Sequence, residues 1–105
     1  MAGMYSIKDL LNLVEQEGAQ ELQLQAGEPP LIVLHGQRRK LDKAPLTSDN
    51  VTELFRSLAT PEQLQELNLC GDIHFVYVSQ NSARFAISAA LRGDGVTLNV
   101  RNLGR

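Results

Sequence analysis

The sequence has a single cysteine, no tryptophan and only five phenylalanine and tyrosine residues together. Because Cys70 is alone, no internal disulfide can form and no multi-cysteine metal site exists, which fits a reducing compartment. Its place in Leu69-Cys70-Gly71, at the predicted end of a helix, favours a small buried apolar role over a reactive thiol. The few aromatic residues also leave little surface for stacking on nucleotide bases.

Long hydrophobic runs and a net positive charge are absent too. No stretch approaches the roughly 18 apolar residues that a membrane span requires, and the first six residues lack the basic and apolar regions of a signal peptide. We therefore expect a cytoplasmic location without membrane insertion. The formal net charge of −2 provides no general basic field, so nucleic acid is not an expected partner.

Catalytic motifs are also missing. A phosphate-binding P-loop needs a lysine and a helix start after its glycines, whereas Gly93-Asp94-Gly95 is followed by Val96-Thr97 and predicts a hairpin turn. His35 and His74 lie far apart and outside any ligand-spaced cluster, so we expect no metal site. With no Ser-His-Asp or Cys-His constellation either, the sequence predicts a non-enzyme without cofactors.

What the sequence does have is the profile of an ordinary soluble globular domain. Its 105 residues, 43% hydrophobic and 21% charged, predict one domain over 1–105. A core of this size buries roughly two-thirds of the surface of the unfolded chain, so the domain needs no metal or disulfide.

The first half predicts a helix followed by three strands. Ser6 and Asp9 resemble a capping box, and Gly18 can end the helix. The buried stripe of this helix is Ile7, Leu10, Leu11 and Val14. Strands are expected at 21–25, 31–34 and 37–41, with a proline-containing loop after the first and a tight turn at His35-Gly36 after the second.

The second half predicts two helices and three more strands. The second helix is capped by Thr47 or Ser48, and its buried stripe is Val51, Leu54, Phe55 and Leu58. The third begins at Thr60-Pro61 and has as its core face Leu64, Leu67 and Leu69. Strands follow at 73–78, with His74 on the exposed face, and at 84–90 and 96–100. The order α-β-β-β-α-α-β-β-β predicts an α+β fold, an antiparallel sheet with helices packed on one face.

The charge is unevenly distributed along the chain. Residues 1–82 carry a net −5, whereas residues 83–105 carry +3 from Arg84, Arg92, Arg101 and Arg105 against Asp94. Four arginines without a lysine suit recognition of carboxylate or phosphate, since guanidinium is planar and bidentate; solvated positions on a strand face are the alternative. Arg38-Arg39-Lys40 forms a second basic segment, which alternation divides between two faces.

The succession of motifs resembles the N-terminal, PAS-like domain of the PilT-type pilus-retraction ATPases over nearly the whole chain. Glu21 to Pro30 (ELQLQAGEPP) is similar to the family's "SDLHLSAGxPP". Gly71 to Phe75 is similar to its "GELDFSY", and Ala83 to Ser88 to its "ARFRVN". Val100-Arg101 falls where the family has "FR", just before the linker to the ATPase core.

The resemblance implies a PAS-like module of a type IV pilus, twitching-motility or type II secretion ATPase, without the catalytic core. In those hexameric motors the N-terminal domain packs on a neighbouring subunit, and its arginines approach the nucleotide bound there. By position, Arg84 and Arg101 would take that interface or nucleotide-proximal role, with Arg92 as an additional basic contact. The expected partner is thus a pilus or secretion ATPase or another subunit of the same kind, and a homo-oligomer is possible.

Several polar positions of the family motifs differ in this chain. Glu21 and Gln23 replace an aspartate and a histidine, His74 replaces an aspartate, and Ala86 replaces an arginine. This pattern indicates a fold that is kept while part of the communication with nucleotide is lost. Both a free-standing accessory protein and a domain of a longer chain fit.

Two functions follow from the sequence. The first is a non-catalytic domain that docks a protein through its sheet or through an edge strand. The alternative is a small-ligand sensor in which Arg84, Arg92 and Arg101 hold a nucleotide such as cyclic di-GMP.

Overall fold

The computed structural model describes residues 6–93 and 95–104, which form three helices and six strands. In chain order these are α1 (Ile7–Glu17), β1 (Glu21–Leu24), β2 (Leu31–Leu34), β3 (Gln37–Lys40), α2 (Ser48–Leu58), α3 (Pro61–Cys70), β4 (Asp72–Val78), β5 (Arg84–Arg92) and β6 (Gly95–Gly104). The predicted α+β class and element order are confirmed. β1 and β3 end one residue earlier than predicted, whereas β5 and β6 run further.

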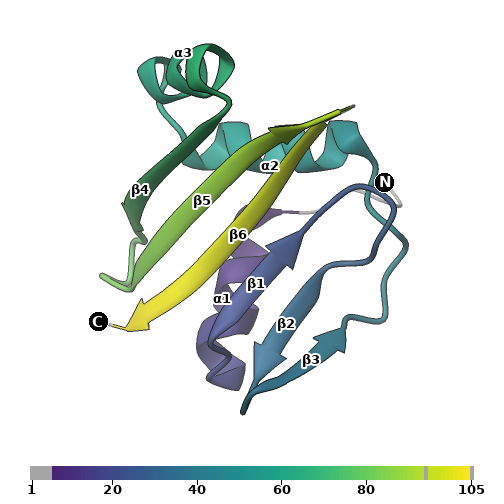
Figure 1. Ribbon diagram of the computed structural model, residues 1–105. Coiled ribbons are helices and arrows are strands. Elements are labelled where there is room, and N and C mark those ends of the chain that lie inside the picture. The colour runs from purple at the N-terminus through teal and green to yellow at the C-terminus, as the bar shows by residue number, and fades with distance from the viewer. Residues whose placement is uncertain (1–5, 94, 105) are drawn as a thin grey trace.

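All six strands belong to one antiparallel sheet with the order β3-β2-β1-β6-β5-β4 (Figure 1). Each half of the chain contributes three consecutive strands that pair with their neighbours in sequence. The two halves meet where β1 pairs with β6, with Glu21 opposite Arg101 and Leu24 opposite Leu98. The outermost strands are therefore β3 and β4.

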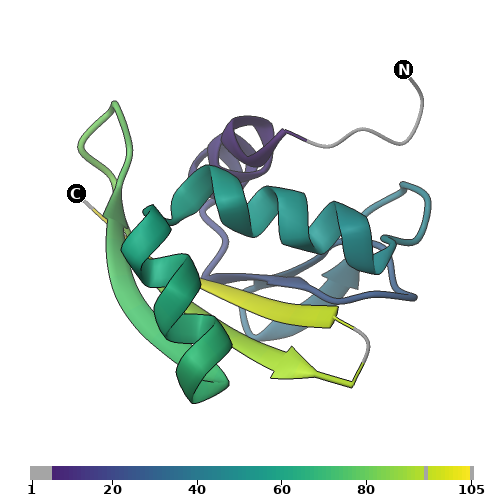
Figure 2. The same cartoon turned by 90° about the horizontal axis from the view of Figure 1, so that it is seen from above.

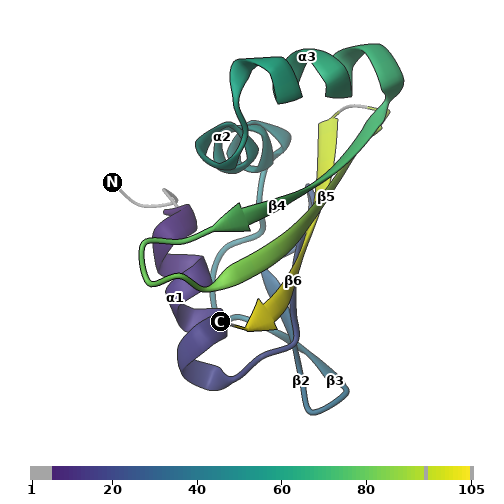
Figure 3. The same ribbon diagram turned by 90° about the vertical axis from the view of Figure 1, so that its left-hand side faces the viewer.

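The helices lie on one side of this sheet. α1 and α2 cover one face, and α3 packs beside the end where β4 begins (Figures 2 and 3). No helix of the described residues lies over the opposite face, which we call the open face. The predicted packing of helices on one face is thus confirmed. None of the described helices is long and apolar enough to cross a membrane.

Side chains of both layers fill the space between sheet and helices. The largest fully buried ones include Phe55 of α2, Phe85 of β5 and Leu22 of β1. Phe55 also meets Phe75 of β4, with ring centroids 6.2 Å apart. The predicted apolar stripes of the first two helices are all buried, in α1 and in α2.

Two predictions about α3 are wrong. Leu69 is 85% exposed, because only Leu67 of this helix is fully buried and a residue two positions further along points about 200° around the helix. Cys70 is exposed rather than buried. α3 packs beside β4 and β5 at the end of the sheet, so its last turn extends beyond the layer that would cover it.

The helix ends follow the predicted capping with one exception. Thr47 and Thr60 each accept a hydrogen bond from the backbone N–H three residues on, in reciprocal capping boxes with Asn50 and Gln63. Gly18 ends α1 in the left-handed conformation. Ser6, by contrast, makes no side-chain cap bond.

The turn predicted at His35-Gly36 is also confirmed, since both residues have positive φ and join β2 to β3. Asp94 of the predicted Gly93-Asp94-Gly95 turn lies outside the described residues, as do Met1–Tyr5 and Arg105. The strands flanking Asp94 pair with Arg92 opposite Gly95.

Candidate functional site

The open face carries side chains that alternate with the buried residues of each strand. Opposed residues of antiparallel strands share a face, so the register extends as rows across the sheet. One row consists of Arg38, Val33, Glu21, Arg101, Ala86 and Val76. The next consists of Lys40, Leu31, Gln23, Asn99, Ser88 and His74. Six strands thus present a continuous surface without a helix over it.

A hydrogen-bonded polar network occupies the centre of this face. Arg38 Nη2 donates to Gln23 Oε1 at 2.9 Å, and Gln23 Nε2 lies 3.4 Å from Glu21 Oε1. Asn99 Nδ2 donates to the same Glu21 oxygen at 3.4 Å. Near β4, His74 Nδ1 and Ser88 Oγ are 2.9 Å apart. These contacts connect side chains of β3, β1 and β6 in one group, and of β4 and β5 in another.

Arg84 and Arg101, the two arginines assigned by resemblance, lie near each other at one corner of the open face. Arg101 is opposite Ala86, and Arg84 is two residues before Ala86 on the same strand, opposite Val78. Both arginines are exposed, and neither has an ion pair within the described part of the chain. Ala86, whose side chain is a single methyl group, is the open-face residue next to both in the register.

Arg92 lies on the same face but not in this corner. It stands opposite Gly95, eight residues along β5 from Arg84, or about 26 Å at the usual rise of a strand. The three arginines therefore do not form one cluster. The predicted sensor, in which Arg84, Arg92 and Arg101 together hold one nucleotide, would need such a cluster.

Exposed apolar side chains lie beside these two arginines, and the sequence analysis did not identify them. Val76 and Val78 are 56% and 58% exposed, and Leu103 is 50% exposed. The β-branched and aromatic composition predicted a strand here, with only His74 assigned to its exposed face. Strict alternation from His74 could have placed Val76 and Val78 on its exposed face. We call Val76, Val78, Arg84, Ala86 and Arg101 the arginine corner.

The two layers of the molecule carry opposite charge. On the open face, the strands present five cations (Arg38, Lys40, Arg84, Arg92 and Arg101) against two carboxylates, Glu21 and Asp72. The three helices carry seven carboxylates against two cations, Lys8 and Arg56. The open face is thus basic and the helix layer acidic, and two of the five cations, Arg38 and Lys40, come from the part of the chain whose net charge is −5.

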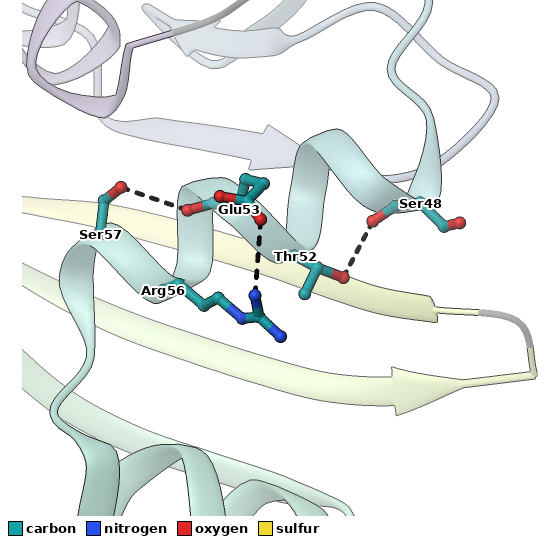
Figure 4. Close-up of polar contacts among 5 residues, drawn as sticks. All are labelled: Ser48, Thr52, Glu53, Arg56 and Ser57. Carbon is teal, nitrogen blue, oxygen red and sulfur yellow. Dashed lines mark hydrogen bonds and ion pairs between the residues drawn. The ribbon is translucent and has the colours of Figure 1, made fainter.

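The outer polar residues of α2 bond within their own helix (Figure 4). Thr52 Oγ1 donates to the Ser48 carbonyl at 2.9 Å, and Ser57 Oγ donates to the Glu53 carbonyl at 3.2 Å. Arg56 Nη1 lies 3.5 Å from Glu53 Oε2 in an exposed pair, which adds little stability. These polar groups of α2 therefore have partners within their own helix. Arg84 and Arg101, by contrast, have no ion pair within the described residues.

Two hollows lie beside the sheet, one at the end where β1 begins and one on the open face. One, of about 470 Å³, lies beside Arg101 and is also lined by Gln20, Glu21 and Asn102. The other, of about 320 Å³, lies across β1–β3, where Lys40 and Glu28 form an exposed ion pair at 2.8 Å. Among the described residues, no group of three or more histidine, cysteine, aspartate or glutamate side chains could hold a metal ion.

Comparison with known proteins supports the resemblance drawn from the sequence. No protein-family model matches the chain. Over 83 residues, or 79% of its length, the chain is 29% identical to the type IV pilus retraction ATPase PilT of Pseudomonas aeruginosa. This alignment covers 24% of that ATPase.

Solved structures of similar ATPases share the fold. A crystal structure of the pilus retraction motor PilT with bound ADP matches 92% of the chain with a TM-score of 0.86 and 21% identity. The ATPase DotB of Legionella pneumophila matches 97% with a TM-score of 0.79 and 18% identity, and DotB of Yersinia pseudotuberculosis has a TM-score of 0.73. The chain spans 29% to 31% of these proteins, which is consistent with an N-terminal domain of such ATPases.

Proposed function

We propose that this chain is a non-catalytic docking domain of a type IV pilus, twitching-motility or secretion ATPase system, acting in the cytoplasm. It binds a partner ATPase or a neighbouring subunit of the same kind through the open face of its sheet. The similarity to PilT and the fold shared with DotB support the system. The lack of a P-loop in the sequence supports a role of this domain without catalysis.

The arginine corner is the observation that carries the proposal. Two exposed guanidinium groups lie one row apart, without an ion pair in the described chain, and Val76 and Val78 lie beside them. Arginine next to desolvated apolar surface is typical of the residues that dominate binding energy at protein interfaces. A partner that supplies carboxylates and an apolar patch would satisfy both.

The test compares two double variants of equal charge. Purified candidate pilus and secretion ATPases are titrated with the 105-residue chain by biolayer interferometry, and the complexes are checked by size exclusion. We expect R84Q/R101Q to weaken binding by about tenfold or more, as loss of charged interface contacts does. R39Q/R56Q, which removes two exposed arginines that lie outside the open face, should stay within about twofold.

Two results would contradict the proposal. A chain that stays monomeric with every candidate ATPase refutes the docking function. Equal losses in the two double variants refute the assignment of the arginine corner, because that result would reflect overall charge only.

The alternative function is binding of a nucleotide at Arg101. The hollow of about 470 Å³ beside this residue is the observation in its favour. The separation of Arg92 from Arg84 weighs against it. Calorimetry with ADP and with cyclic di-GMP decides: the absence of heat at millimolar nucleotide excludes this function.

A further inference from the structure

The outer edge of β4 exposes backbone groups that no strand or helix of the described chain pairs. The hydrogen bonds that flank the β4–β5 ladder run from Leu91 N to Gly71 O at 2.8 Å and from Ser79 N to Ala83 O at 2.9 Å. Hydrogen-bonded pairs alternate along an antiparallel ladder, so the odd-numbered residues between them bond to β5. The N–H and C=O groups of His74, Val76 and Val78 therefore point away from the sheet.

The other edge of the sheet is protected, whereas this one is not. β3 has four residues, three of them consecutive cations, and charged side chains on a short strand discourage pairing with another chain. β4 has seven residues, and its only carboxylate, Asp72, is at its beginning. Long apolar edges are the ones that accept an added strand.

The accessible part of this edge is the second half of β4. α3 leads into β4 and lies above its first residues, whereas the rest of the strand runs clear of the helix (Figure 3). The segment His74–Val78 is thus available over a length that matches a short recognition strand. It also contains Val76 and Val78, the two valines of the arginine corner.

We propose that His74–Val78 accepts an extended segment of a partner protein as a seventh strand, and that this segment alternates acidic with apolar side chains. The proposal rests on the docking function and specifies its partner's chemistry. Backbone bonds to His74, Val76 and Val78 supply affinity, and the side chains of the added strand supply specificity.

The register determines which side chains the partner strand needs. A residue placed opposite Val78 continues the row that contains Arg84, and one placed opposite Val76 continues the row of Ala86 and Arg101. An acidic side chain opposite Val78 would be separated from Arg84 by Val78 alone, and one opposite Val76 would be separated from Arg101 by Val76 and Ala86. Both would lie in the rows that contain the unpaired guanidinium groups. Residues between them point to the other face, where half-buried Phe75 and Tyr77 require apolar neighbours.

The probe is a fluorescein-labelled seven-residue peptide, Thr-Val-Glu-Val-Glu-Val-Thr, with its glutamine analogue as control. Binding is followed by fluorescence anisotropy with the 105-residue chain. Val76→Pro removes an outward N–H without removing a bond to β5, whereas Val76→Thr keeps the donor. We expect saturable binding that V76P weakens about tenfold or more relative to V76T, since proline removes a bond and adds bulk at the edge. R84Q/R101Q should weaken binding of the glutamate peptide and leave the analogue unchanged.

Amide hydrogen exchange on the unaltered chain tests the geometry without any substitution. Addition of the peptide should protect the amides of His74, Val76 and Val78 and leave Phe75 and Tyr77 unchanged. The proposal is wrong if the peptide does not bind, if folded V76P binds as V76T does, or if protection lacks this alternation. Edge protection that rises with the concentration of the chain alone identifies a second copy as the occupant and also refutes it. ATPase binding can depend on the arginine corner while the β4 edge fails these tests. That result would support the docking function and refute strand addition.

Discussion

Glu21 and Arg101 lie directly opposite each other on β1 and β6, yet the carboxylate is contacted by Gln23 and Asn99 rather than by the guanidinium. Two neutral side-chain amides thus contact the carboxylate where the guanidinium of an ion pair would otherwise contact it. The carboxylate is held against the sheet, and Arg101 has no ion pair within the described chain. This arrangement leaves the cation available to a group outside the molecule.

The first prediction concerns the stability of Arg101 variants. Arg101→Gln should change the free energy of unfolding by less than about 0.5 kcal/mol, as substitutions at unpaired surface positions do. Arg101→Glu should cost about 0.5 to 1 kcal/mol, because like charges directly opposite in a sheet repel. Urea denaturation at low salt measures both. Equal stabilities of the two variants would show that the charge at position 101 does not interact measurably with the Glu21 carboxylate.

The second prediction concerns Gly95, where the start of β6 passes close to α2. A Cβ added here would lie 2.8 Å from Ser48 Cβ, closer than two carbon atoms tolerate. Gly95→Ala should therefore lower stability by about 1 to 3 kcal/mol, the usual cost of overpacking. Ser48→Gly removes the clashing atom, so the double variant should recover much of the loss in thermal unfolding. Strictly additive effects would contradict a steric cause.

The third prediction concerns the turn between β2 and β3. His35 and Gly36 have φ of 53° and 79°, which is the pattern of a type I′ hairpin turn. Histidine tolerates this conformation less well than asparagine, so His35→Asn should raise stability by about 0.5 kcal/mol. His35→Val should lower it, since a β-branched residue is strained at positive φ. Chemical denaturation of the two variants gives the sign of each effect, and stabilisation by valine would refute the strain.

The fourth prediction compares the three helix starts, with Ser6 of α1 as the control for Thr47 of α2 and Thr60 of α3. Thr47→Ala and Thr60→Ala should each cost about 1 kcal/mol, because each threonine accepts a hydrogen bond from an otherwise unpaired N–H. Ser6→Ala should cost less than about 0.3 kcal/mol, because Ser6 makes no such bond. Thermal unfolding of the three variants compares them under one condition. A loss at Ser6 as large as at the threonines would contradict this assignment of the caps.

Periodicity predicted most of the fold because burial of an apolar stripe is a local pattern. The stripes of the first two helices and the caps at Thr47 and Thr60 needed only neighbours in sequence. Leu69 and Cys70 were predicted wrongly because their burial depends on how far α3 overlaps the sheet, which only tertiary packing determines.

The candidate site was predictable in part. Resemblance pointed to Arg84 and Arg101, and alternation could have placed both on one face. Their proximity depends on the pairing of β5 with β6, as does the separation of Arg92. The polar network of Gln23, Glu21 and Asn99 required the β1–β6 pairing, for which the sequence has no local signal.

That same pairing of β1 with β6 has a consequence for how the chain folds during synthesis. Glu21 of β1 is opposite Arg101 of β6, about 80 residues later in the chain. Strand pairs separated by this much chain are slow to form. While a ribosome is still producing β4 and β5, β1 is paired with β2 on one side only, because the strand that pairs with its other side is not yet made. The centre of the sheet therefore closes last, and until then the nascent chain exposes the unpaired backbone groups of β1 at a strand edge.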